Sequence, residues 1–125
     1  MGRIRENITI DGRNYWTLFD SGSRNNYIIE STVGGLPTFS YKVLQKVHIG
    51  GKQHKISQDC RIDCKIQGKE VVGLARVIDH MGNDEEGKEI EVLIGALTMQ
   101  EWGIRLDIPA EKLDLSLYPK EFLEF

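Results

Sequence analysis

The chain has 125 residues, 40% of them hydrophobic and 28% charged, with a formal net charge of −3 at pH 7. This length suits one domain with its own core, and the composition excludes a disordered chain. The acidic balance argues against nucleic-acid binding, and no apolar run approaches the roughly 18 residues of a membrane span. Residues 1–7 lack the apolar segment of a secretory signal, so we expect a single cytoplasmic domain over residues 1–125 with no membrane partner.

Alternating apolar and polar residues, interrupted by turn residues, predict four β-hairpins in chain order. Alternation with period 2 is typical of strands with one buried face. Asp-Gly or Gly-Gly between such segments is among the strongest short hairpin signals. The expected hairpins are 8–19 with a turn at Asp11-Gly12, 43–56 with a turn at Gly50-Gly51, 60–78 with a turn near Gln67-Gly68, and 104–117 with a turn over 109–112.

Two segments depart from this pattern. Residues 80–91 are polar, acidic and interrupted by glycines, so we expect an exposed loop; their carboxylates lack the ordered spacing of a calcium-binding loop. Residues 96–102 are good helix formers, and Gly103 suits the position after a helix C-terminus. The elements together predict an all-β fold with one short helix near the C-terminus.

Cys60 and Cys64 lie in a segment that alternates like a strand. In a strand, residues i and i+4 share a face but lie about 13 Å apart. That separation exceeds the roughly 7 Å limit for a disulfide and prevents both thiolates from binding one zinc ion. We therefore expect two free thiols, as in a reducing compartment. No pair among His48, His54 and His80 has metal-ligand spacing, so neither a metal site nor a cofactor is predicted.

The residues that could carry chemistry are Asp20-Ser21-Gly22-Ser23, which directly follow the apolar segment 16–19. A carboxylate at the end of a buried strand is held by packed backbone, and burial makes its ionisation costly. Such a setting is typical of working carboxylates. The same tripeptide is also good turn chemistry, so a simple β-turn is the alternative interpretation.

The order of elements resembles the retropepsin family, the retroviral-type aspartic proteases. The resemblance covers about residues 8–106; residues 107–125, a hairpin and a tail with an apolar end, extend beyond it. It depends most on Asp20-Ser21-Gly22 and on an apolar-Ile-Gly segment 73 residues later. The matching features are a hairpin leading into Asp20-Ser21-Gly22, a glycine-tipped hairpin over 47–51, a hairpin over 62–73, and Val92-Leu93-Ile94-Gly95 before a short helix.

This resemblance implies an acid-protease barrel with a hairpin flap. It also implies a peptidase in which water, held between two aspartates that share one proton, attacks a peptide carbonyl. No other aspartate of the chain begins an Asp-[Ser/Thr]-Gly. The expected enzyme is therefore a homodimer that cleaves a peptide or protein substrate, with Asp20 of each chain at the two-fold axis.

The resemblance also implies roles for single residues. Asp20 is the expected catalytic carboxylate. Ser23 stands where retroviral members usually have Ala, and a hydroxyl that donated to the carboxylate would favour its charged form and an acidic pH optimum. The remaining expected roles are a hydrogen bond across the axis for Ser21, close backbone approach to substrate for Gly22, packing beside the active-site loop for Gly95, and the flap tip for Ile49, Gly50 and Gly51.

Two further hypotheses stay open at this point. The first is a dimeric binding module with the same fold and no turnover, since a fold does not imply a function. The second is a small β-barrel that binds a ligand and uses Asp20-Ser21-Gly22 only as a turn. A monomeric protein at high concentration would favour the small barrel over both dimers.

Overall fold

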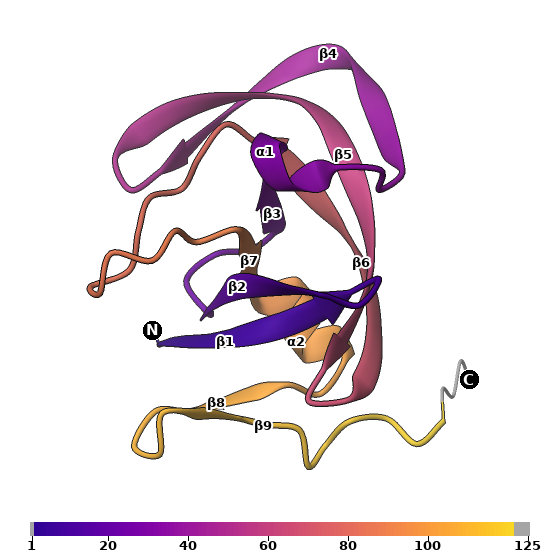
Figure 1. The fold of residues 1–125 in the computed structure, drawn as a ribbon, viewed down its shortest axis with the longest axis vertical. Helices are drawn as coiled ribbons and strands as arrows, with labels where there is room; N and C mark the ends of the chain where they lie inside the picture. The colour runs from indigo at the N-terminus through magenta and orange to yellow at the C-terminus, as the bar shows by residue number, and fades with distance from the viewer. Residues whose placement is uncertain (1, 122–125) are drawn as a thin grey trace.

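Strands dominate the computed structural model, which describes residues 2–121 (Figure 1). The predicted all-β fold is confirmed. Residues 122–125, the expected apolar end of the tail, lie outside the described residues. In chain order the elements are β1 (Arg3–Ile10), β2 (Arg13–Asp20), β3 (Asn26–Ile29), α1 (Glu30–Val33), β4 (Thr38–Ile49), β5 (Lys52–Ile66), β6 (Lys69–Ile78), β7 (Val92–Ile94), α2 (Ala96–Glu101), β8 (Arg105–Asp107) and β9 (Lys112–Asp114).

Three of the four predicted hairpins form with the expected turns. β1 pairs with β2, β4 with β5, and β5 with β6. Both central residues of each turn have positive φ: 50° and 79° at Asp11-Gly12, 59° and 78° at Gly50-Gly51, and 51° and 79° at Gln67-Gly68. Turns of this kind match the twist of the flanking strands, which explains why the turn residues predicted the hairpins. The second and third hairpins share one 15-residue strand, β5.

The fourth hairpin is shorter than predicted. Only Arg105–Asp107 and Lys112–Asp114 form its ladder, as a separate two-stranded sheet. The expected arm to residue 117 ends early because the Asp114 carboxylate accepts a hydrogen bond from the Ser116 backbone, which turns the chain. Figure 1 shows β8 and β9 below β1 and β2, on the side away from the β4–β5 hairpin.

The prediction of a single short helix was incomplete. The chain has a second helix, α1, besides the predicted one, and the buried Thr32 hydroxyl donates to the Ile29 carbonyl within its first turn. The loop at 80–91 is exposed at most positions but buries Ile90, whose backbone N–H donates to Gly82. The predicted helix forms as α2, followed by Gly103 with φ of 65°.

No helix of the described residues is long and apolar enough to cross a membrane.

The main sheet has the strand order β1-β2-β7-β3-β6-β5-β4, and Thr9 of β1 also pairs with Lys65 of β5. This extra pairing brings the first strand back to the far side of the sheet and curls it into a barrel. β7 lies between β2 and β3, parallel to the first and antiparallel to the second. The short strand β7 therefore carries Gly95 to the end of β2, where Asp20 lies.

Inward-facing residues of the barrel form one large core, and a second cluster lies under the β4–β5 hairpin. Cys60 and Cys64 both belong to the buried face of β5 and are free thiols. Burial raises the pKa of Cys64 to about 12, so this thiol stays protonated and unreactive at neutral pH. The second cluster consists of Tyr27, Ile29, Ile56, Ile78 and Leu93, with Leu18, Tyr41, Val47, Ile49 and Met81 packed against it.

Candidate active site

Asp20 is the last residue of β2 and follows the fully buried Phe19. It is itself only 8% exposed. The parallel pairing of residues 17–19 with Val92–Ile94 fixes this end of the strand in the middle of the sheet. The sequence-based expectation of a carboxylate held at the end of a buried strand is therefore met by the geometry of β2.

The Asp20 carboxylate has two partners among the residues that the structure describes. Oδ1 accepts a hydrogen bond of 2.8 Å from the Gly22 backbone N–H, and Oδ2 lies 3.4 Å from Nε of Arg3. The Ser23 N–H donates to the Asp20 carbonyl oxygen. Asp20 thus closes a turn with its own side chain. The close backbone approach to substrate that the resemblance implies for Gly22 stays a prediction.

Ser21 is tied to the start of the chain. Its Oγ accepts a hydrogen bond of 2.9 Å from the Gly2 N–H, and its own N–H donates to the Gly2 carbonyl at 3.1 Å. These bonds hold the loop after Asp20 against Gly2, the residue that precedes β1. The hydrogen bond across a dimer axis that the resemblance implies for Ser21 stays a prediction.

Ser23 does not have the partner that we expected. Its hydroxyl lies 3.0 Å from the Asn25 carbonyl oxygen, to which it donates, and not beside the Asp20 carboxylate. The reason is local: the loop turns so that Asn25 presents its carbonyl to the Ser23 hydroxyl. The idea that Ser23 favours the charged carboxylate by a direct hydrogen bond was therefore wrong.

Gly95 packs against this loop, as the resemblance implied. A Cβ atom at position 95 would overlap the Asn25 carbonyl oxygen and lie 2.7 Å from that of Ser23. The following N–H groups of Ala96 and Leu97 donate to the carbonyls of Ser23 and Arg24 at 2.6 and 3.2 Å. The start of α2 therefore clamps the loop after Asp20.

Sequence reasoning missed Asn26, the residue that links these parts. Asn26 is buried; its Oδ1 accepts from the Gly95 N–H at 2.9 Å and its Nδ2 donates to the Thr98 hydroxyl at 2.7 Å. A buried amide is stable only when its donors and acceptors are satisfied. The available signal was one polar residue at the head of the apolar segment 26–29.

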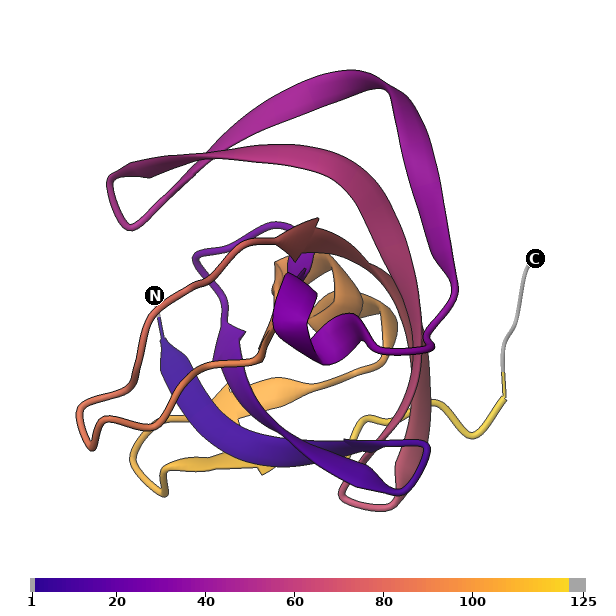
Figure 2. The same cartoon turned by 45° about the horizontal axis from the view of Figure 1, so that its top comes forward.

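The tip of the β4–β5 hairpin lies over the same site. Ile49 and Gly50 line a cavity of about 340 Å³ together with Asp20, and Leu18, Leu93 and Met81 supply its apolar wall. Gly51 completes the turn but is not among the lining residues. Figures 1 and 2 both show the hairpin tip on the side of the barrel where β1 starts. The structure thus brings together Asp20 and two of the three predicted flap residues.

Charged groups from β1 and the loop after β6 surround the cavity. Arg5 pairs with Glu85 at 2.6 Å. Asp84 accepts hydrogen bonds from the Lys88 and Glu86 backbones and from the Trp16 indole; the Lys88 bond is the largest cause that holds its pKa below the usual value. The charged side chains Arg5 and Asp84, which line the cavity, therefore already have partners within the protein. Among residues 2–121 no cluster of His, Cys, Asp or Glu could hold a metal ion.

His54 and Asp79 connect the hairpin to the loop beside the cavity. The buried His54 ring, in β5, places Nδ1 2.7 Å from Oδ1 of Asp79, and Oδ2 of the same carboxylate lies 3.3 Å from Nδ1 of His80. Asp79 directly follows β6. This contact, which sequence analysis did not predict, joins the part of the hairpin near its tip to the residue that precedes the loop at 80–91.

Comparison with known proteins identifies the fold. No family model matches the chain, and no curated protein matches it. The retroviral protease-like domain of Ddi1 from Leishmania major superposes with a TM-score of 0.64 at 15% identity, over 93% of this chain and 90% of that one. The EIAV protease complexed with the inhibitor HBY-793 superposes with a TM-score of 0.61 at 13% identity, over 84% of this chain and 92% of that one. The fold is retropepsin-like, as the resemblance implied.

Proposed function

We propose that this chain of retropepsin-like fold is an aspartic endopeptidase that works as a homodimer. The observation that carries the proposal is the position of Asp20. It is a buried carboxylate at the end of a central strand, and it lines one cavity with the hairpin tip at Ile49 and Gly50. This is the arrangement that a carboxylate needs to meet a peptide held under a flap.

The reaction follows from two such carboxylates placed side by side. Two carboxyl groups a few Å apart share one proton and titrate as a unit. The ionised Asp20 removes a proton from a water molecule as the water attacks the peptide carbonyl. The protonated Asp20 of the partner donates a hydrogen bond to the carbonyl oxygen and stabilises the developing charge. Ile49 and Gly50 exclude bulk water by covering the bound peptide.

A second copy supplies the second carboxylate, because the chain contains one Asp-Ser-Gly. A groove of about 380 Å³ beside the Asp20 loop supports this assembly. Ser21 lies on the wall of this groove, and Ile108 is 46% exposed there. A C2 interface at this face would bring the two Ser21 residues, and hence the two Asp20 loops, together. The apolar part of the groove consists of Ala96, Met99, Ile104, Leu106 and Ile108.

One observation favours the alternative, a dimeric binding module of the same fold without turnover. Arg3 lies 3.4 Å from the Asp20 carboxylate and is its cross-strand neighbour in the β1–β2 hairpin. In a binding module, Asp20 would serve only this ion pair and the turn to Gly22. The Arg3 side chain is 60% exposed, however, so it leaves the carboxylate easily when a partner chain or a substrate arrives.

Cleavage of a random peptide library tests the proposal. We expect the wild-type protein to cut peptides with an activity that pepstatin inhibits, and we expect Asp20→Asn to lower the rate by about 10²–10⁴-fold. Asp11→Asn is the matched control, because Asp11 lies in a hairpin turn with positive φ that Asn also adopts.

Cleavage that survives in Asp20→Asn would exclude the peptidase. A wild-type dimer that binds peptides without cutting them would establish the binding module in its place.

A further inference from the structure

The β4–β5 hairpin differs in charge from the rest of the molecule. Residues 38–57 contain four lysines and no acidic residue. The remaining residues hold 12 of the 16 Lys and Arg and all 19 Asp and Glu, which is a net charge of −7. A basic hairpin on an acidic protein creates a local field that attracts anionic partners. The four lysines are Lys42, Lys46, Lys52 and Lys55.

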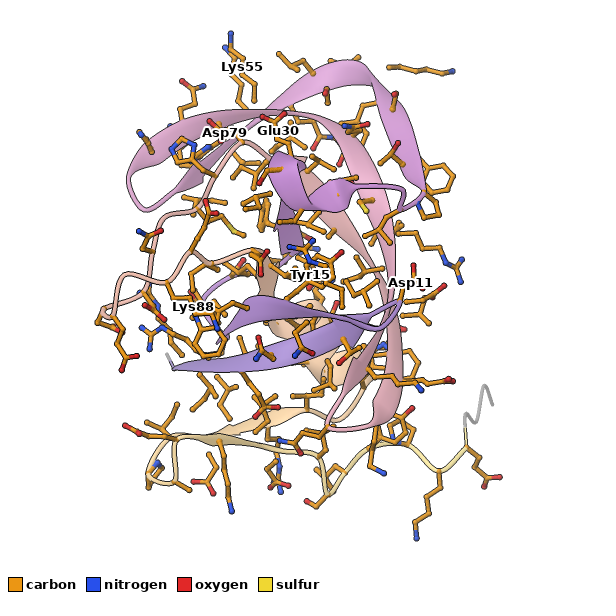
Figure 3. All side chains as sticks on the ribbon, in the orientation of Figure 1. Asp11, Tyr15, Glu30, Lys55, Asp79 and Lys88 are labelled. Carbon is orange, nitrogen blue, oxygen red and sulfur yellow. The ribbon has the colours of Figure 1, made fainter. Side chains whose placement is uncertain are left out.

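Two of these lysines form an unfavourable pair that the fold does not need. Lys46 of β4 and Lys55 of β5 are direct cross-strand partners. Their neighbours Val47 and His54 point toward the barrel, so the two lysines share the outer face. Like charges in directly opposite positions destabilise a hairpin. Figure 3 shows Lys55 extending away from the barrel.

No acidic side chain among residues 2–121 forms a salt bridge with this pair. None of the salt bridges among residues 2–121 includes Lys42, Lys46, Lys52 or Lys55. The nearest carboxylate in the sequence, Asp59, accepts a hydrogen bond from the Tyr41 hydroxyl. The positive charge of the outer face is therefore available to a partner.

An apolar patch adjoins the two lysines. The β4–β5 pairing shifts between Ser40 and Gln45, so the residues between them form a bulge on the edge strand. Within it, Val43 is 74% and Leu44 is 50% exposed. Among residues 2–121, β4 has β5 as its one neighbour in the sheet, so the bulge lies on an edge strand. We call the surface made of Lys42, Val43, Leu44, Lys46 and Lys55 the outer patch.

We propose that the outer patch docks an acidic segment of a partner protein. Carboxylates of that segment pair with Lys42, Lys46 and Lys55, and its apolar side chains cover Val43 and Leu44. The patch lies on the face of the hairpin opposite to Ile49 and the cavity. The outer patch therefore lies outside the proposed active site. The docking proposal does not depend on whether the chain is a peptidase.

Edge protection is the competing explanation, because lysines on edge strands block aggregation. It accounts for Lys42 and Lys46 but not for Lys55, since β5 lies inside the sheet between β4 and β6. A nucleic acid is a poorer fit than a protein segment. The bulge exposes aliphatic Val43 and Leu44, and aliphatic side chains do not provide the stacking surface on which unpaired bases bind.

Fluorescence anisotropy with a labelled peptide tests the proposal. The probe is four repeats of Glu-Glu-Leu, the control peptide is four repeats of Lys-Lys-Leu, and the protein carries Asp20→Asn so that no peptide is cut. We expect the acidic probe to bind and the basic one to fail. Lys46→Gln combined with Lys55→Gln weakens binding about tenfold, because each exposed ion pair contributes up to roughly 1 kcal/mol. Lys65→Gln with Lys120→Gln removes the same charge elsewhere and leaves binding unchanged.

Three results would overturn the proposal. The first is equal binding of the acidic probe to the two double variants. The second is aggregation of the Lys46, Lys55 variant with no change in binding, which would assign the lysines to edge protection. The third is tighter binding of a single-stranded oligothymidine than of the acidic probe. Because the protein carries Asp20→Asn throughout, each result is independent of the proposed peptidase activity.

Discussion

The backbone of Gly95 packs directly against the carbonyl oxygen of Asn25, so that a side chain at position 95 has no room. Three of the surrounding atoms belong to the backbone of the loop after Asp20, which cannot rotate away. This single contact joins β7, α2 and the candidate active-site loop. A side chain at position 95 is therefore expected to displace the loop that follows Asp20.

Gly95→Ala is expected to destabilise the protein by about 1–3 kcal/mol, since overpacking displaces the loop. Chemical denaturation monitored by Trp fluorescence measures the change in the free energy of unfolding. Gly35→Ala is the control, because a Cβ atom there meets nothing within 4 Å and the φ angle of Gly35 is not positive. Similar stability of the two variants would show that the loop adapts to the added methyl group.

Ser23→Ala is expected to leave the pH–rate profile in place while it lowers stability by about 1 kcal/mol. The hydroxyl bonds to the Asn25 carbonyl and does not touch the Asp20 carboxylate. Removing it loses one partly buried hydrogen bond. Peptide cleavage from pH 3 to pH 7 gives the profile. A shift of the profile relative to the wild type would show that Ser23 does act on the carboxylate.

Ile108→Glu is expected to weaken dimerisation at least about tenfold, or roughly 1.4 kcal/mol. The substitution places a charge in the apolar groove beside Ser21, where the proposed dimer excludes water. Sedimentation equilibrium measures the dissociation constant, and specific activity at low protein concentration falls with it. The control is Leu74→Glu, a similarly exposed apolar position on β6. If only the control variant dissociates, the interface lies on another face.

The contribution of Asp79 to stability depends on pH. The hydrogen bond from His54 is the largest cause that holds the pKa of Asp79 below its ordinary value. For a carboxyl group whose pKa is lower in the folded than in the unfolded chain, the stabilisation is complete above the unfolded pKa, about 3.9, and is lost as the pH falls through the folded pKa. Asp79→Asn should therefore reduce the free energy of unfolding more at pH 5.5 than at pH 3.

A double-mutant cycle separates this contact from other titrating groups. In a His54→Gln background the pH dependence of the Asp79→Asn effect should become smaller, because the main donor to the carboxylate is gone. If the pH dependence is the same in both backgrounds, the lowered pKa of Asp79 has another origin, such as the His80 backbone N–H.

Most strands were predictable because their pattern is local. Period-2 alternation in β5 and turn residues such as Asp11-Gly12 are readable without knowledge of any partner strand. β3 and β7 have no alternation, because strands in the middle of a sheet are buried on both faces. The four-residue helix α1 is too short to show a helical period.

In the candidate site, too, the features set by neighbouring residues were predictable and the contacts between distant segments were not. Three of the site's features could be predicted from neighbouring residues alone: the carboxylate that ends a buried strand, the position of the hairpin tip, and the helix after Gly95. Four contacts became known only from the fold: Ser23 with Asn25, Asn26 with Gly95 and Thr98, Arg3 with Asp20, and His54 with Asp79. A buried polar group must have a hydrogen-bond partner, but many groups of the chain have the chemistry to be that partner. Which one it finds depends on where strands distant in sequence are brought together.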